Sequence, residues 1–219
     1  MPEIDLMRNY PKTDRANLLR VREEVTTEDR KIAKKFGKEY FDGPRRLGLG
    51  GYQYDPKYFV KVVQDFIQYY KLEPNSRILD VGCGKGFMMK DFHDALPLGE
   101  IHGIDISEYC YENAIPEVKA NMKIASCDNL PYPDHYFDLV ISIATIHNLN
   151  KEGVKKSITE MMRVGKEKFY IKVNGYKNEV EKHSLERWNL VANTILHVDE
   201  WNLLFNEIGF TGDYSFFST

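Results

Sequence analysis

The residues best suited to chemistry are one carboxylate and three glycines within a single short segment, Asp80-Val-Gly-Cys-Gly-Lys-Gly86. The apolar residues Ile78, Leu79 and Val81 predict a buried strand that runs into this turn, and a helix should follow it. A dinucleotide-binding loop requires Gly-x-Gly-x-x-Gly, but its last position here would be Phe87. A carboxylate at the end of the strand suits a cationic ligand and is a poor neighbour for a pyrophosphate.

A second acidic residue follows about twenty positions beyond the glycines, as in nucleoside-binding α/β units. The segment Glu100-Ile-His-Gly-Ile-Asp105 predicts a second strand that ends in this acid. Asp105 can accept hydrogen bonds from both hydroxyls of a ribose. Because NAD enzymes share this acid, it does not identify the cofactor alone.

A third segment, Ser126-Cys-Asp-Asn-Leu-Pro-Tyr-Pro-Asp-His-Tyr-Phe-Asp-Leu-Val-Ile-Ser142, completes a set of motifs. In order and spacing, over roughly residues 75–150, the set resembles the class I S-adenosylmethionine-dependent methyltransferases. The resemblance implies that the glycine loop passes beneath the methionine part of S-adenosylmethionine, whose product is S-adenosylhomocysteine. The implied cofactor-binding residues are Asp80 for the amino group, Asp105 for the ribose, Asp128 and Asn129 beside the adenine, and Gly82, Cys83, Gly84, Ile106 and Ser142 around them.

Two other readings of this cofactor domain stay open. One is a nucleotide-binding domain of another kind, such as a NAD-type oxidoreductase, although the remaining chain is too short for a separate substrate domain. The other is a non-catalytic cofactor-binding partner subunit that supports another methyltransferase. No Asp/Asn-Pro-Pro-Tyr tetrad follows the fourth predicted strand, which argues against methylation of adenine or glutamine amides.

Segments outside the core carry a second, less specific resemblance. Phe36-Gly-Lys-Glu-Tyr-Phe-Asp-Gly43, Gly50-Gly-Tyr-Gln-Tyr-Asp55 and Thr211-Gly-Asp-Tyr-Ser-Phe216 resemble methyltransferases encoded among bacterial capsule and lipopolysaccharide genes. This resemblance implies a small-molecule acceptor. We expect a hydroxyl or amine on a sugar, a nucleotide-linked sugar or a phosphorylated precursor of a surface polysaccharide.

Methyl transfer is an in-line displacement, so alignment and exclusion of water are the main requirements, and a hydroxyl acceptor also needs a base. His147, just after the fourth predicted strand, is the first candidate base, with a packing role as the alternative. Tyr52 and Tyr54 are the second candidates, as the wall of a lid whose flexible part is Gly48–Gly51. An ordinary aromatic pair is their alternative.

Five further residues are candidates for binding the acceptor. Arg45 and Arg46 can hold a phosphate or a uronic acid through their guanidinium groups, although a solvated basic pair explains them as well. His183, Arg187 and Trp188 occur in a polar stretch and are chosen by position alone, so an exposed surface helix is the alternative.

Composition limits the function classes. A net charge of −3 provides no electrostatic footprint for nucleic acid. The three cysteines form neither a disulfide framework nor a metal-ligand spacing, and no apolar run reaches the length of a membrane span. We therefore expect a cytoplasmic protein with a small-molecule acceptor and without metal, membrane or nucleic-acid partners. A homodimer is an open alternative for its assembly.

Strands and helices alternate along the chain, which predicts an α/β fold. We expect a Rossmann-like, doubly wound and mostly parallel sheet of about six strands, with helices on both faces. Residues 1–75 should form an N-terminal helical lid, and residues 76–219 the cofactor-binding domain, with 174–198 as a helical insert. The resemblance implies a seventh strand and an antiparallel last pair, but only one strand follows the last predicted helix.

Two helices are predicted with particular boundaries. Thr26-Thr-Glu-Asp29 reads as a capping box, and the helix that it opens should carry an apolar stripe and end at Gly43-Pro44. A second helix should cover residues 107–119, with Ser107 as its N-cap.

Overall fold

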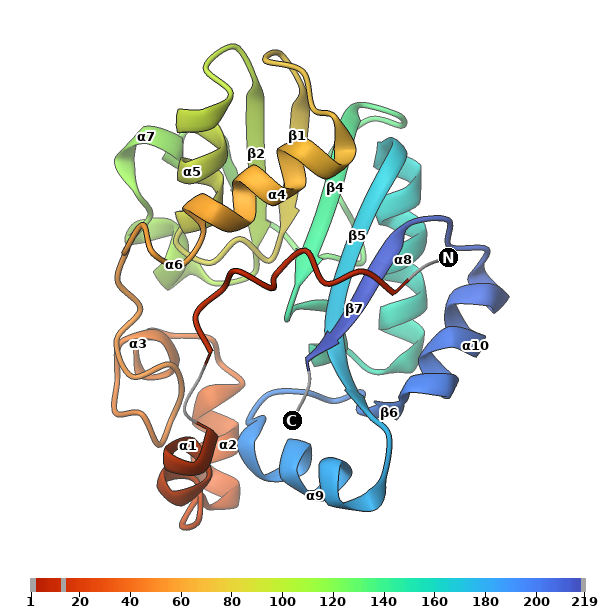
Figure 1. Ribbon diagram of the computed structural model, residues 1–219. Helices are drawn as coiled ribbons and strands as arrows, with labels where there is room; N and C mark the ends of the chain where they lie inside the picture. Colours follow the sequence, from red (N-terminus) through yellow and green to blue (C-terminus); the bar gives the residue numbers. More distant parts are fainter. Residues whose placement is uncertain (1–2, 13–14, 218–219) are drawn as a thin grey trace.

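The computed structural model describes residues 3–12 and 15–217. Its centre is a seven-stranded sheet in which every strand pairing is parallel, as the alternating pattern predicts (Figure 1). The strand order is β3-β2-β1-β4-β5, and both β6 and β7 pair with β5. The strands are β1 (Arg77–Val81), β2 (Glu100–Asp105), β3 (Met122–Ile124), β4 (Phe137–Ile143), β5 (Gly165–Tyr176), β6 (Leu196–His197) and β7 (Asp213–Phe217).

Helices cover both faces of this sheet, which confirms the predicted fold class (Figure 1). None of those in the described residues is long and apolar enough to cross a membrane. They are α1 (Arg15–Val21), α2 (Thr27–Ala33), α3 (Lys38–Phe41), α4 (Val60–Tyr70), α5 (Phe87–Ala95), α6 (Glu108–Glu112), α7 (Pro116–Lys119), α8 (Lys151–Val164), α9 (Glu179–Trp188) and α10 (Val198–Ile208), with a short 3-10 helix η1 (Ile146–Asn148).

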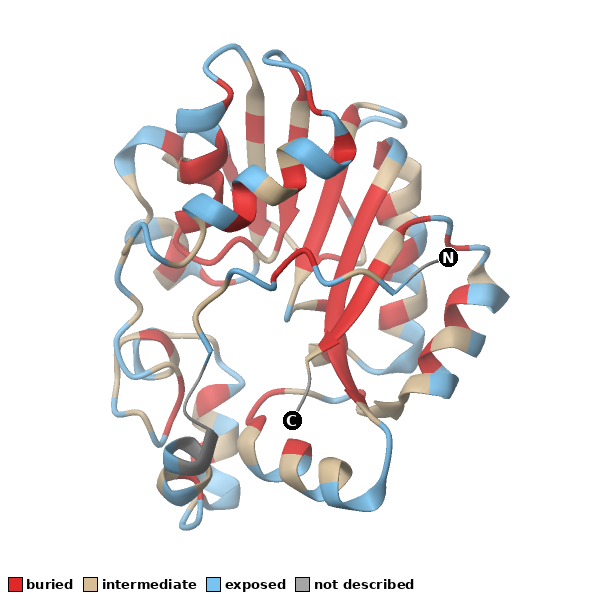
Figure 2. Cartoon of the chain, viewed as in Figure 1, coloured by how far each residue is buried: buried red, intermediate tan, exposed pale blue. Residues whose placement is uncertain are grey.

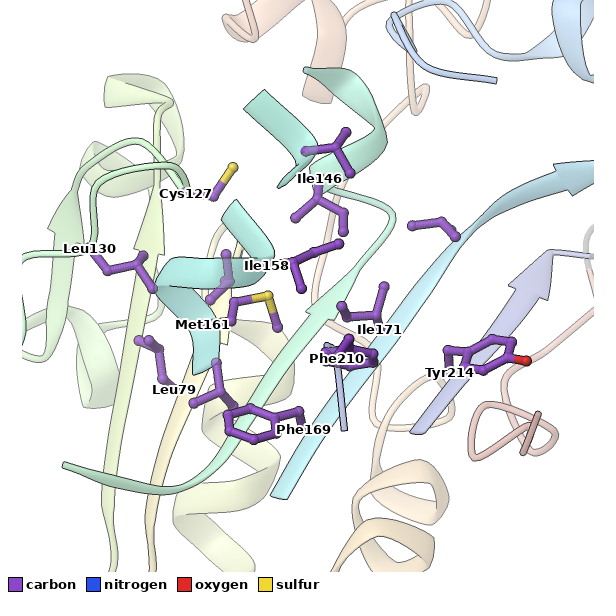
Figure 3. Packing of buried hydrophobic residues seen from close by; sticks show 14 of the residues in the cluster. Leu79, Cys127, Leu130, Ile146, Ile158, Met161, Phe169, Ile171, Phe210 and Tyr214 are labelled. Carbon is purple, nitrogen blue, oxygen red and sulfur yellow. The ribbon is translucent and has the colours of Figure 1, made fainter. Parts of the chain in front are cut away.

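Two hydrophobic cores lie on opposite faces of the sheet because side chains alternate along each strand. On one face, α8 and α10 pack on Leu79, Val140 and Ile171, within the cluster shown in Figure 3. On the other face, α4 and α5 pack on Ile78 and Ile141. The central strands are accordingly buried along most of their length, as Figure 2 shows.

The chain N-terminal to α4 lies across the sheet and beyond its carboxyl edge (Figure 1). Residues 3–12 cross the face that carries α4, and Glu3 forms a parallel bridge with Tyr214 of β7. Helices α1 to α3 lie beyond the carboxyl ends of the strands, near α9. Arg30 joins the two groups of helices, because its guanidinium donates to the carbonyls of Glu186 (2.8 Å) and Asn189 (2.7 Å).

The capping box at Thr26 is confirmed, but the prediction of one long helix after it is wrong. The Thr26 side chain accepts from the Asp29 amide, and the Asp29 carboxylate accepts from the Thr26 amide. Helix α2 ends at Ala33, and the chain turns at Phe36, whose φ of 49° is left-handed. The Phe36 carbonyl accepts from the Ser107 hydroxyl (2.6 Å), so a tertiary contact replaces the helical pattern.

Other boundaries also differ from the sequence prediction. Ser107 caps α6 as expected, but Pro116 starts a separate α7, since a residue before proline disfavours the helical region. The insert is helical only over α9: its first residues extend β5 to Tyr176, and Leu196–His197 form the short β6. This two-residue strand raises the sheet from six strands to seven.

Candidate functional site

The glycine loop has the close backbone packing that its sequence suggests. Gly82, Gly84 and Gly86 have left-handed φ angles of 87°, 57° and 80°. A Cβ atom at Gly82 would lie 1.9 Å from the Thr145 hydroxyl, so only glycine fits there. The Gly84 amide donates to Asp105 Oδ2 (2.8 Å) and thereby links the loop to the end of β2.

Asp80 and Asp105 form a carboxylate pair at the carboxyl ends of β1 and β2. Asp80 is only 5% exposed, and its carboxylate makes no hydrogen bond or ion pair with the rest of the described chain. Burial and the charge of Asp105 raise the pKa of Asp80 to about 7. Burial also raises the pKa of Asp105, although the amides of Ser107 and Gly84 oppose that shift. One buried and one partly buried carboxylate, with no cation beside them in the described chain, favour a positively charged ligand.

A cavity of about 400 Å³ opens beside Asp105. It brings the exposed side chain of Ile106 (58%) together with Ser107, Tyr109, Phe36 and Gly37. The segment around Phe36 and the chain that follows β2 therefore share its walls.

The other expected cofactor-binding residues lie outside this lining. Asp128 accepts from the Ser126 hydroxyl (2.5 Å), and Asn129 is exposed. Cys83 is buried under Gly103 of β2. Ser142 is fully buried, and its hydroxyl has no partner in the described chain.

Asp42 and Lys85 are two residues of the site that the sequence interpretation missed. Asp42 Oδ2 accepts from Lys85 Nζ (2.5 Å) and from the Tyr109 hydroxyl (2.7 Å), while Oδ1 accepts from the Tyr52 amide (2.8 Å). Lys85 also donates to the Tyr52 carbonyl (2.8 Å). These four residues, here called the Asp42 latch, fasten the N-terminal segment to the glycine loop. The lysine inside the glycine loop was the sequence feature that could have indicated a carboxylate partner for this loop.

Both candidate lid tyrosines reach the glycine loop or the helix after it. A Cβ atom at Gly84 would lie 2.9 Å from the Tyr52 ring, which packs 4.4 Å from the Phe87 ring. The Tyr54 hydroxyl donates to Asp91 Oδ1 on α5 (2.5 Å). Tyr52 therefore lies directly over the loop, whereas Tyr54 anchors the segment further along α5.

His147 is enclosed on the far side of the site, in η1. Its ring is 2% exposed, and the side-chain nitrogens of Asn174 and Asn189 lie 3.3 and 3.5 Å from Nε2. Its backbone carbonyl accepts from the amides of Asn193 and Thr194. Burial lowers the pKa of His147 to about 3, so the ring is neutral. No hydrogen bond joins it to the tyrosines in the described chain.

The five residues expected to bind the methyl acceptor make contacts with other parts of the protein. Arg45 donates to the carbonyls of Gly48 and Leu49 within its own turn. Arg46 pairs with Asp29 (2.9 Å). The remaining three lie on α9, where His183 pairs with Glu186 (3.6 Å), Arg187 pairs with Glu23 (3.7 Å) and Trp188 ends the helix.

The residues present fit a nucleoside with an attached cation. The carboxylate pair supplies the negative charge, the glycine turn allows a close approach to the backbone, and the cavity beside Ile106 has one apolar wall. No group of three or more histidine, cysteine, aspartate or glutamate side chains suited to a metal ion occurs in residues 3–12 and 15–217.

Comparisons with known proteins agree with this geometry. The family model for a methyltransferase domain matches residues 78–168. The chain is 30% identical to the phosphoethanolamine N-methyltransferase of Triticum aestivum over 111 residues, 48% of this chain and 22% of the relative. It is 32% identical to the tRNA (carboxymethyluridine(34)-5-O)-methyltransferase of Arabidopsis thaliana over 132 residues, 59% and 31% respectively. The chain thus spans less than a third of these curated relatives.

Solved structures extend the likeness to the fold. The crystal structure of the YcgJ protein from Bacillus subtilis superposes with a TM-score of 0.56 at 22% identity, over 67% of this chain and 66% of that one. A SAM-dependent methyltransferase from Archaeoglobus fulgidus gives 0.54 at 19% identity, over 68% and 66%. The fold is therefore that of the class I S-adenosylmethionine-dependent methyltransferases, and the matched domain implies S-adenosylmethionine as the cofactor.

Proposed function

We propose that this protein is an S-adenosylmethionine-dependent methyltransferase that acts on a hydroxyl or amine of a small molecule. The observation that carries the proposal is the buried Asp80, which has no partner in the described chain and lies beside Asp105 at the start of the glycine loop. S-adenosylmethionine supplies a methyl group on a sulfonium, together with an ammonium and a ribose. Asp80 suits the ammonium, and Asp105 suits the ribose hydroxyls.

The remaining residues around the loop exclude water and hold the acceptor in line with the methyl group. Residues 1–75 serve as a lid in this proposal, with Tyr52 over the loop and the Asp42 latch as its fastening. Tyr54 supports the lid through its hydrogen bond to Asp91.

Both ring nitrogens of His147 are engaged, Nδ1 by the Asn174 backbone amide (3.4 Å) and Nε2 by the side chains of Asn174 and Asn189. His147 can therefore act as a base only if the acceptor displaces one of these groups. Its low pKa makes it a weak acceptor for the proton of an alcohol. An amine that arrives deprotonated needs no such base, so we favour an amine acceptor over a hydroxyl. The name of the wheat relative, a phosphoethanolamine N-methyltransferase, supports an amine on a small phosphorylated molecule.

The finer assignment concerns the pathway of the acceptor. We propose a sugar, a nucleotide-linked sugar or a phosphorylated precursor of a surface polysaccharide, on the strength of the segments around Phe36, Gly50 and Thr211. A tRNA acceptor is the competing proposal, because relatives named as tRNA methyltransferases match 59% and 47% of this chain.

Calorimetry and turnover test the function together. S-adenosylmethionine and S-adenosylhomocysteine should bind to the isolated chain, and NAD should not. Replacing Asp105 with alanine should weaken binding by about 2 kcal/mol or more, because two hydroxyls lose a charged acceptor. Binding of NAD alone would favour an oxidoreductase. Cofactor binding without S-adenosylhomocysteine formation, across amines, alcohols and tRNA, would favour a non-catalytic partner subunit.

A further inference from the structure

Lys172 is a buried cation that the cofactor does not account for. It lies within β5, a strand buried over most of its length, and is only 6% exposed. Burying an ammonium in a sheet is costly unless an anion accompanies it. The identity of that anion is therefore informative about the site.

The sheet register puts Lys172 on the same face as Asp80. Asp80 aligns with Ile141 of β4, which in turn aligns with Tyr170 of β5. Lys172 is two residues beyond Tyr170, on the same side of the strand and nearer the carboxyl edge. From strand spacing and rise, its Cα lies about 12 Å from that of Asp80. Asp80 and Lys172 therefore lie on the same face of the sheet, two strands apart.

The anion beside Lys172 comes from the N-terminal segment. Asp5 Oδ1 lies 2.6 Å from Lys172 Nζ, yet the Asp5 side chain is 53% exposed. The ring of Phe217 lies 5.2 Å from the same ammonium. The buried lysine therefore depends on a carboxylate that is half in solvent.

The expected arginines do not take this role in the structure. Arg45 is bound to backbone carbonyls of its own turn, and Arg46 is paired with Asp29. Lys85, the other buried lysine near the site, is held by Asp42. Arg22 is buried as well, but its guanidinium donates to the carbonyls of Arg46 and Gly48. Among the described residues, Lys172 is therefore the buried cation that is paired with a half-exposed carboxylate.

We propose that Lys172 binds an anionic group of the acceptor, a phosphate monoester or a carboxylate, in exchange for Asp5. This inference rests on the proposed methyltransferase function and specifies its substrate class. The exchange keeps the buried ammonium paired throughout, which avoids the large cost of an isolated buried charge. Asp5 Oδ1 also accepts from the Met7 amide (3.0 Å), and the carboxylate is half exposed, so water can replace Lys172 beside it while this local hydrogen bond remains. A lysine ammonium is a suitable point charge for either anion.

Binding of simple anions to the S-adenosylhomocysteine-loaded chain tests the proposal. Inorganic phosphate and acetate are titrated separately, which distinguishes the two sources of negative charge. Lys172→Met should weaken binding of the preferred anion by about tenfold or more, as expected for a charged hydrogen bond. Lys172→Arg should retain most of it. Lys168→Met, on the same strand but lining a groove at the opposite edge of the sheet, is the matched control and should bind as the native chain does.

The change in anion affinity caused by Asp5→Asn distinguishes an anion-binding role of Lys172 from a purely structural ion pair with Asp5. If Asp5 occupies the anion site, its removal should tighten phosphate or acetate binding several-fold. Unchanged or weaker binding in Asp5→Asn, or native binding in Lys172→Met, would overturn the proposal. So would absence of anion binding in a native chain that binds S-adenosylhomocysteine. Failure of the native chain to bind S-adenosylhomocysteine would instead count against the proposed function, and the same titration checks that each variant is folded.

Discussion

The protonation state of one residue, Asp80, should make the affinity for the cofactor depend on pH. Its pKa is raised to about 7 by burial and by Asp105, so below pH 7 the free protein carries a proton there. An ammonium binds the ionised carboxylate, and the affinity for S-adenosylmethionine should therefore increase with pH. For one group of this pKa we expect about an eightfold gain between pH 6 and pH 7.5. Calorimetry on Asp80→Asn should show weaker binding without this rise.

His147 should reduce stability in acid. Its folded pKa of about 3 lies below the ordinary value of 6.5, so between these values only the unfolded chain takes up the proton. The free energy of unfolding should therefore fall as the pH drops below 6.5, by about 1.4 kcal/mol per pH unit from this group. Urea unfolding at pH 6.5 and pH 5 measures the loss, which is about 1.6 kcal/mol because the unfolded histidine is already half protonated at pH 6.5.

His147→Gln serves as the comparison because it cannot take up the proton. Asp80 acts in the opposite sense, since its stabilising contribution is full below pH 3.8 and is lost as the pH rises through 7. It does so equally in both chains. The difference between native and His147→Gln chains therefore isolates the histidine. An equal acid loss in the two would show that the ring is not buried as described.

Between elements, the Asp42 latch carries the attachment of the lid to the glycine loop. In Asp42→Ala, Lys85 would remain buried without its partner, and the Tyr52 amide and the Tyr109 hydroxyl would each lose an acceptor. We expect a loss of about 3 kcal/mol in stability and local release of residues 38–55.

Limited proteolysis with and without S-adenosylhomocysteine measures that release. Cleavage within 38–55 should be faster in Asp42→Ala than in the native chain. Asp55→Ala, whose carboxylate pairs only with the neighbouring exposed Lys57, is the control and should digest at the native rate. Native-like digestion of Asp42→Ala would mean that other contacts hold the segment.

Local sequence patterns correctly predicted the elements that are determined by residues close to one another in the chain. The strand before Asp80, the glycine turn, and the caps at Thr26 and Ser107 depend on neighbouring residues, and each is found where the sequence indicates. The break at Phe36 depends on a hydrogen bond from Ser107, 71 positions away, so no helical period could reveal it.

The residues of the candidate site likewise fall into two groups, those predictable from local spacing and those placed by contacts between distant segments. Its glycines and carboxylates lie within one βαβ unit, where spacing along the chain constrains their position in space. The contacts of Lys172 with Asp5 and of Asp42 with Lys85 join segments that are far apart in the sequence. Neither composition nor spacing indicates which residues of such segments meet. His147 was placed correctly after β4, but its enclosure depends on Asn174 and Asn189, which the sequence did not connect to it.

For the whole molecule, net charge bears on the choice between a small acceptor and RNA. The chain has 30 lysines and arginines against 33 aspartates and glutamates, and several basic side chains near the lid are already paired or bound to carbonyls. Affinity for nucleic acid comes largely from cations that neutralise phosphates and release counterions. The net charge of −3 therefore predicts only weak sequence-independent attraction to RNA.

We accordingly expect no binding of a tRNA or a DNA duplex tighter than about 10 µM at physiological salt. Fluorescence anisotropy with labelled tRNA, repeated at low and high salt, measures both the affinity and its salt dependence. Weak binding that disappears with added salt would agree with a small-molecule acceptor, since any protein with exposed lysines shows it. A sub-micromolar complex with tRNA that survives physiological salt would instead favour the activity named for the Arabidopsis relative.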